Sequence, residues 1–184
     1  MAEAPVATTN IALYGRSGAG KSTLAQFLEQ QHGYQHARTG VACRTLCREL
    51  FGSESKSLMN EVTDALRRID DRVWLRAGLR GLRQDMPIAF DSMRFEADYT
   101  FFYAQGYILV EVRAPVMLRV ARLGERGQLF DVSKDDAHPA EAELDGFAFD
   151  FTIDNTSDLS ALRGQIADLL SRRWEDVYGR RDYR

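Results

Sequence analysis

One glycine-rich stretch has the residue types and the spacing of an anion-binding loop. Gly15–Ser22 reads G-R-S-G-A-G-K-S and fits the phosphate-binding pattern G-x-x-x-x-G-K-[ST]. In such a loop the backbone N–H groups point inward, and glycine avoids the Cβ atoms that would collide with phosphate. Lys21 would reach the β- and γ-phosphates, and the Ser22 hydroxyl would ligate Mg²⁺. The pattern predicts binding of a nucleoside triphosphate, with ATP expected as donor. The residues expected around its phosphates are Gly15, Ser17, Gly18, Ala19, Gly20, Lys21, Ser22 and Thr23.

An acidic residue later in the chain is placed to work with this loop. Pro87–Asp91 reads as a short strand that ends in Asp91. In parallel α/β sheets, ligands bind at the carboxyl ends of the strands. We therefore expect Asp91 to share the Mg²⁺ site with Ser22 and to act in catalysis, although Asp91 could instead cap a helix.

Three arginines recur at helical spacing beyond the strongest strand. Arg119, Arg122 and Arg126 lie three and four residues apart, along one face of a helix that Pro115 opens. They lead into the polar segment Gly124–Gly146, which we interpret as a lid formed by a loop, a flap or a short helix pair. Arg122 and Arg126 are expected to stabilise the transferring phosphoryl group when the lid closes. The alternative is a solvated basic face.

The surrounding pattern predicts strands alternating with helices. Further strands are expected at 11–14, 34–37, 107–112 and 149–154, and helices at 40–50, 57–69, 71–84, 95–105, 115–123 and 157–177. A helix with Leu24, Phe27, Leu28 and Gln31 on one face is expected after the loop. Gly33 is a suitable C-cap for the helix after the loop. The basic end, 179–184, is expected to fray. This alternation predicts one α/β domain over 1–184, with a five-stranded parallel sheet between helices, a three-layer sandwich.

Composition excludes several classes of protein. The 184 residues carry a formal charge of −3, so no global basic field indicates nucleic-acid binding, although an arginine-lined cleft could overcome this. No apolar run is long enough to span a membrane, and 1–10 lacks a signal-peptide pattern, so we expect a cytoplasmic protein. Zinc is not expected at Cys43 and Cys47 or at His32 and His36, because Gly33 interrupts the histidine pair and the cysteines suit helix packing.

The segment after the second strand resembles the nucleoside monophosphate kinases. Thr39-Gly40 with Arg44 matches their T-G-x-x-x-R motif. The resemblance implies that Thr39, Gly40 and Arg44 surround the acceptor's phosphate, with Arg38 alongside. Asp91-Ser92-Met93-Arg94 is similar to the D-G-x-P-R pattern of the family, which implies that Arg94 also grips that phosphate.

The last third of the chain is similar to phage deoxynucleoside monophosphate kinases and to dephospho-CoA kinases. Phe149–Asn155 looks like their D-Y-V-I-D-N ending, and His138-Pro139-Ala140-Glu141 is similar to the H-P-S-E segment of some phage enzymes. This likeness implies that Asn155 and the residues after it lie near the donor base. It also implies transfer of the γ-phosphoryl group to a (deoxy)nucleoside monophosphate.

Several alternatives remain open at this point. Dephospho-CoA kinase normally has an aspartate where this chain has Arg38-Thr39-Gly40. Shikimate- and gluconate-type kinases would lack T-G-x-x-x-R, and GTPases would need an N-K-x-D motif. A kinase of a modified base within DNA and a non-catalytic nucleotide-binding module are further possibilities. The aromatic group Phe101, Phe102, Tyr103 and Tyr107 is expected in the core rather than at the interface of a homodimer.

Overall fold

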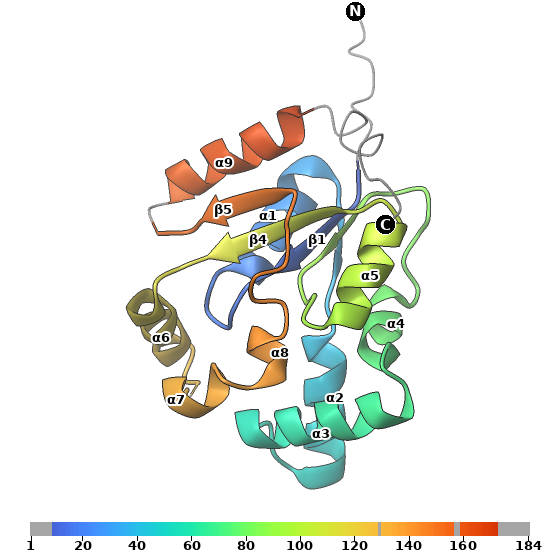
Figure 1. The fold of residues 1–184 in the computed structure, drawn as a ribbon, viewed down its shortest axis with the longest axis vertical. Coiled ribbons are helices and arrows are strands. Elements are labelled where there is room, and N and C mark those ends of the chain that lie inside the picture. Colours follow the sequence, from blue (N-terminus) through green and yellow to red (C-terminus); the bar gives the residue numbers. More distant parts are fainter. Residues whose placement is uncertain (1–8, 129, 157–158, 173–184) are drawn as a thin grey trace, which may run out of the picture.

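A parallel five-stranded sheet forms the centre of the protein. The computed structural model describes residues 9–128, 130–156 and 159–172 (Figure 1). The strands are β1 (Ile11–Tyr14), β2 (Gln35–Ala37), β3 (Ile88–Phe90), β4 (Ile108–Arg113) and β5 (Phe151–Asp154), in the order β2-β3-β1-β4-β5. Every neighbouring pair is parallel, so the carboxyl ends of all strands meet at one edge. The predicted α/β architecture is confirmed.

Helices cover both faces of the sheet. Alternation along β1 sends Ile11 and Leu13 toward one face and Ala12 and Tyr14 toward the other. The first face packs against α1 (Lys21–His32) and α9 (Leu159–Ser171), and the second against α4 (Val73–Leu79) and α5 (Glu96–Ala104) (Figure 1). Phe102 and Tyr107 belong to the second core, and Phe101 and Tyr103 pack against it, which confirms the core interpretation of the aromatic group.

The remaining helices lie around the carboxyl edge of the sheet. These are α2 (Gly40–Phe51), α3 (Lys56–Ile69), α6 (Val116–Glu125), α7 (Val132–Asp135) and α8 (Pro139–Ala142). Helices α2 and α3 pack against each other. Helix α8, which comes much later in the sequence, lies near the start of α3 (Figure 1). Among the described ranges, no helix combines the length and apolarity that crossing a membrane requires.

The element boundaries differ from the predictions at a few places. Helix α4 ends at Leu79, short of the predicted Gln84, because Arg80 is extended and Gly81 adopts a left-handed φ of 79°. Of the three forms considered for 124–146, the structure shows the short helix pair, α7 and α8. The predicted start of the last helix at 157, its end at 177 and the basic end of the chain lie outside the described residues.

Candidate active site

The glycine loop between β1 and α1 is packed so closely that its glycines have no room for side chains. Gly20 has a φ of 105°, and a Cβ there would lie 2.1 Å from the Asn155 side chain. Gly18 has a φ of 80°, and its Cβ would lie 2.7 Å from the Arg119 carbonyl oxygen. The loop is therefore clamped between α6 and the segment after β5, and its amides keep a fixed arrangement before any ligand binds.

Lys21 is buried at the base of the loop. Its ammonium group donates to the Gly15 carbonyl oxygen and, at 3.2 Å, to that of Arg16. Burial, aided by the nearby positive charge of Arg94, lowers the pKa of Lys21 to about 8. The amine therefore lies close to its titration point, and an anion bound in the loop would favour the charged form.

Asn155 and Arg122 brace the loop from outside. The Asn155 amide donates to the Ala19 carbonyl oxygen at 2.7 Å, and Arg122 donates to the Asn155 carbonyl oxygen at 3.1 Å. Arg122 also lies 3.5 Å from the Gly18 carbonyl oxygen. In this conformation, the structure places Arg122 against the backbone of the phosphate loop, whereas Arg126 lines the open cleft described below.

Asp91 follows β3 and carries a buried carboxylate, with the residue 5% exposed. One oxygen accepts from Ser92 Oγ at 2.5 Å, and the other pairs with His36 Nε2 at 2.7 Å. Burial alone would raise the pKa of Asp91, but the hydrogen bonds from His36, Ser92 and Ser22 outweigh it and lower the pKa to about 2. Asp91 is therefore ionised at neutral pH and touches Ser22, the other expected Mg²⁺ ligand. A carboxylate and a hydroxyl are the oxygen donors that suit Mg²⁺, so these residues fit the ion.

His36 has a defined proton position because Arg38 Nε donates to its Nδ1 at 2.9 Å. The proton of the neutral ring is then on Nε2, which donates to Asp91. Arg38 itself is exposed and lies 3.6 Å from Glu29. His36 was considered only as part of the zinc alternative, because a lone histidine on a short strand carries no recognisable pattern.

One open cleft connects the predicted donor and acceptor residues. Its volume is about 720 Å³, and it is bounded by the phosphate loop, the ends of β2 and β3, the starts of α2 and α3, and the end of α6. Predicted site residues that line it are Ser17, Gly18, Lys21, Ser22, Arg38, Gly40, Arg44, Asp91, Arg94 and Arg126. Arg44 folds back over Gly40, where an added Cβ would lie 3.3 Å from its guanidinium.

A smaller pocket of about 70 Å³ adjoins the cleft beneath Thr39 and Gly40. Its walls combine apolar and aromatic side chains with a few hydrogen-bonding groups. They include Cys43, Met59, Asn60, Thr63, Trp74 and Phe95. Cys43 and Cys47 are buried free thiols.

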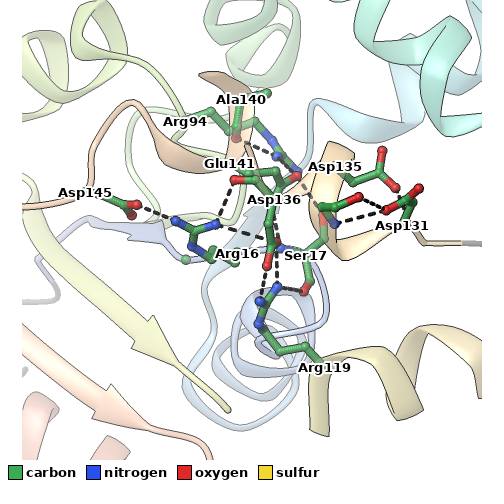
Figure 2. Close-up of polar contacts among 12 residues, drawn as sticks. Arg16, Ser17, Arg94, Arg119, Asp131, Asp135, Asp136, Ala140, Glu141 and Asp145 are labelled. Atoms are coloured by element: carbon green, nitrogen blue, oxygen red, sulfur yellow. Dashed lines mark hydrogen bonds and ion pairs between the residues drawn. The ribbon is translucent and has the colours of Figure 1, made fainter. Parts of the chain in front are cut away.

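Glu141 on α8 occupies the centre of a charged cluster that the sequence analysis did not identify as part of the site (Figure 2). It accepts hydrogen bonds from the Ser17 amide at 2.6 Å, from Ser17 Oγ at 2.7 Å, and from Lys56 and Arg94 at 2.8 Å each. Lys56 was also not predicted as a site residue, because the apolar spacing along α3 did not show which end of the helix faces the site. The H-P-A-E segment was the available signal, and it was noted only as a likeness.

A second group of contacts fastens the segment after α6 to the phosphate loop (Figure 2). Asp136 pairs with Arg119 at 2.5 Å, and its carbonyl oxygen accepts from Arg16 at 2.8 Å. Asp145 pairs with Arg16 and accepts from Tyr14 at 2.7 Å. Arg119, the one of the three arginines that was not assigned to catalysis, is buried in this network at 4% exposure.

Comparisons with solved structures identify the architecture. A gluconokinase from Sinorhizobium meliloti 1021 superimposes with a TM-score of 0.62 at 19% identity, covering 95% of this chain and 98% of that one. The chain therefore shares the fold of that kinase. A shikimate kinase from Acinetobacter baumannii, in complex with shikimate, gives a TM-score of 0.55 at 17% identity and covers 96% and 97% of the two chains.

Sequence comparison gives a more limited match. A cytidylate kinase from Caldicellulosiruptor saccharolyticus is 40% identical over 62 residues, which are 34% of this chain and 26% of that protein. The chain thus matches about a quarter of the length of this curated relative. No family model matches the chain.

Proposed function

We propose that this protein is an ATP- and Mg²⁺-dependent kinase that phosphorylates a (deoxy)nucleoside monophosphate to the diphosphate. One observation carries the proposal: the phosphate loop and a group of cationic side chains from other elements line the same cleft. These are Arg38, Arg44, Lys56 and Arg94. Such a concentration of guanidinium and ammonium groups suits an acceptor that itself bears a phosphate.

Each residue then has a defined task in phosphoryl transfer. Lys21 and the loop amides bind the β- and γ-phosphates of ATP, and Arg44 and Arg94 hold the acceptor phosphate. An oxygen of that phosphate attacks the γ-phosphorus, a new P–O bond forms, and the bond to the leaving ADP breaks. Arg126, at the rim of the cleft, supplies positive charge to the transferring group when the segment closes.

Asp91 and Ser22 would hold Mg²⁺. When bound, Mg²⁺ offsets negative charge on the phosphates during transfer. Ser92 and His36 keep the Asp91 carboxylate oriented toward the cleft. Water is excluded only if the cleft is covered, which matters because water would compete with the acceptor for the γ-phosphoryl group.

The smaller pocket supports a nucleotide acceptor over a simple sugar acid. It shares Gly40 and Arg94 with the cleft, and Trp74 provides apolar surface for a planar base, whereas the ring of Phe95 is covered by Arg67 at 3.4 Å. Asn60 and Thr63 add hydrogen-bonding groups at its wall. A gluconate or shikimate acceptor would have no planar ring to place against Trp74.

An ADP-release assay over a panel of acceptors tests the proposal. The panel contains the ribose and deoxyribose monophosphates of each base, with dephospho-CoA, gluconate, shikimate and duplex DNA as alternatives. CMP and dCMP come first, because the matched curated protein is a cytidylate kinase. We expect turnover with one or more monophosphates, and Lys21→Ala should reduce it about 100- to 1,000-fold.

Other results would redirect the proposal. Turnover confined to gluconate, shikimate, dephospho-CoA or DNA would show a kinase with a different acceptor. ATP binding without turnover on any acceptor would show a nucleotide-binding module. A Lys21→Ala variant as active as the wild type would contradict the role given to the phosphate loop.

A further inference from the structure

Glu141 is the point at which three parts of the cleft are joined. Its side chain is 0% exposed, and its partners come from separate elements: Ser17 from the phosphate loop, Lys56 from the start of α3, and Arg94 from the segment after β3. Each of these partners also lines the cleft. The buried carboxylate therefore holds side chains that form part of the cleft wall, and Figure 2 shows it close to Ser17 and Arg94.

The chemistry of the contacts favours a fixed arrangement. Both carboxylate oxygens are used: Oε2 accepts from the Ser17 amide, and Oε1 accepts from Ser17 Oγ, Lys56 and Arg94. Burial alone would raise the pKa of Glu141, but the positive charges of Arg94, Lys56 and Lys21 outweigh it and hold the pKa well below its usual range. Glu141 thus stays ionised at neutral pH. Hydrogen bonds to an ionised carboxylate are charge-assisted, and such bonds are strong and directional.

We propose that Glu141 is a positioning residue that couples the donor site to the acceptor site. Through Ser17 it fixes the phosphate loop, and through Lys56 and Arg94 it fixes the cations that face the acceptor phosphate. A displacement of the phosphate loop is transmitted to the acceptor-facing cations, and the reverse, because the same carboxylate holds the loop and the cations. The acceptor half of this inference rests on the proposed function, whereas the donor half requires only that the loop binds a nucleotide.

The direct test replaces Glu141→Gln, which keeps the size of the side chain and removes its charge. Titration with ADP measures the donor site without any acceptor, and steady-state kinetics with the best acceptor of the panel measures the other site. We expect the acceptor KM to rise about 10- to 100-fold, the effect of losing a charge-assisted hydrogen bond, and the ADP Kd to rise several-fold. Glu141→Asp should recover part of the loss.

Glu143→Gln is the matched control. Glu143 lies in the same segment and accepts a hydrogen bond from the Glu96 amide, but it points toward Arg67 rather than the loop. We expect its ADP Kd and acceptor KM to match those of the wild type. A double variant, Glu141→Gln with Arg94→Ala, should raise the acceptor KM by less than the product of the two single effects, because Glu141 acts partly through Arg94 and partly through Lys56.

A second pair of variants keeps the test decisive if Glu141→Gln does not fold. Ser17→Ala removes a contact on the donor side, and Lys56→Gln removes one on the acceptor side. Coupling predicts cross-effects: Ser17→Ala raises the acceptor KM, and Lys56→Gln raises the ADP Kd. The proposal would be overturned if Ser17→Ala changed only the ADP Kd and Lys56→Gln changed only the acceptor KM.

Two further outcomes have clear meanings. Tighter ADP binding by Glu141→Gln would overturn the proposal and show that the carboxylate occupies the phosphate position as an internal competitor. If no monophosphate is an acceptor, the proposed function is wrong. The ADP affinities of the variants then decide whether Glu141 fixes the donor site. Unchanged ADP affinity in both Glu141→Gln and Lys56→Gln would then reject it.

Discussion

Lys21 and Asp91 lie in the same cleft, and the pKa of each is lowered, with opposite consequences for charge. Burial lowers the pKa of Lys21 to about 8, so its positive charge is held weakly before a nucleotide binds. Hydrogen bonds lower the pKa of Asp91 to about 2, so its negative charge is secure. Asp91, on the side expected to bind Mg²⁺, is therefore charged throughout the neutral pH range. Lys21, on the side expected to bind phosphate, can gain positive charge when phosphate enters.

The state of Lys21 gives a prediction at the residue scale. Below pH 8 the amine is protonated and attracts phosphate, and above pH 8 it becomes neutral. We expect the ADP Kd to be flat from pH 6.5 to 7.5 and then to rise toward about 10-fold per pH unit above pH 8. Titration calorimetry from pH 6.5 to 9.5 measures this.

Lys21→Arg is the control for that prediction, because a guanidinium keeps its charge throughout the range. Its ADP Kd, whatever its absolute value, should not rise between pH 8 and 9.5. A wild-type Kd that stays constant to pH 9.5 would show that Lys21 does not carry the pH dependence assigned to it.

At the scale of elements, the sequence predicted the sheet and the phosphate loop because both depend on local pattern. Apolar runs identify strands, and G-x-x-x-x-G-K-S has a fixed backbone consequence at the start of α1. The early end of α4 depends on Gly81, one glycine in a helical pattern that could equally have continued. A helical pattern of apolar residues can continue across one glycine, so the end of α4 was wrongly predicted at Gln84 instead of Leu79.

The charged cluster behind the cleft could not be predicted in the same way. Glu141 meets Ser17 and Lys56 across 124 and 85 positions of sequence separation. No local pattern encodes such a meeting, because it depends on how α8 and α3 are placed by the rest of the fold. The arginine helix shows the same limit: spacing put Arg119 and Arg122 on one helix, and packing turned both toward the loop backbone.

Asp98 gives a prediction for the start of α5. Its carboxylate accepts from the Arg94 and Phe95 amides at 3.1 and 3.2 Å, and burial raises its pKa from 3.8 to about 6. Between these values the folded protein binds the extra proton, so the contribution of Asp98 to stability falls as pH rises from about 4 to 6. We expect the free energy of unfolding to fall by about 2–3 kcal/mol relative to Asp98→Asn over this range.

Urea unfolding of both proteins at pH 4, 5, 6 and 7 measures the difference. Asp98→Asn keeps an oxygen that can accept the capping hydrogen bonds but has no titrating proton. Parallel stability curves for the two proteins would show that Asp98 does not titrate between pH 4 and 6.

For the whole molecule, the segment after α6 is bound to the phosphate loop rather than left open. Asp136 contacts Arg16 and Arg119, and Asp145 contacts Arg16 and Tyr14. The role of 124–146 as a lid stays a prediction, and it implies that opening breaks these contacts together. We expect the same contacts to link motion of the segment to motion of the loop.

Hydrogen exchange tests this linkage. Asp136→Asn weakens the pair with buried Arg119, so we expect faster amide exchange both in 131–145 and in the phosphate loop. Lys134→Gln is the control, because Lys134 is exposed and, within the described part of the chain, its ammonium group pairs with Asp131 across 3.8 Å rather than with the loop. Faster exchange in 131–145 alone, with the loop unchanged, would show that the two segments open independently.

The clamp on the phosphate loop also bears on how the chain acquires its site during synthesis. The motif is complete once residue 22 has been made, but β1 pairs with β3 and β4, around residues 89 and 108. The Ala19 carbonyl oxygen gains its partner only when Asn155 arrives. A nascent chain therefore carries the whole motif long before it has the support that shapes it, and the anion site is among the last parts of the protein to form.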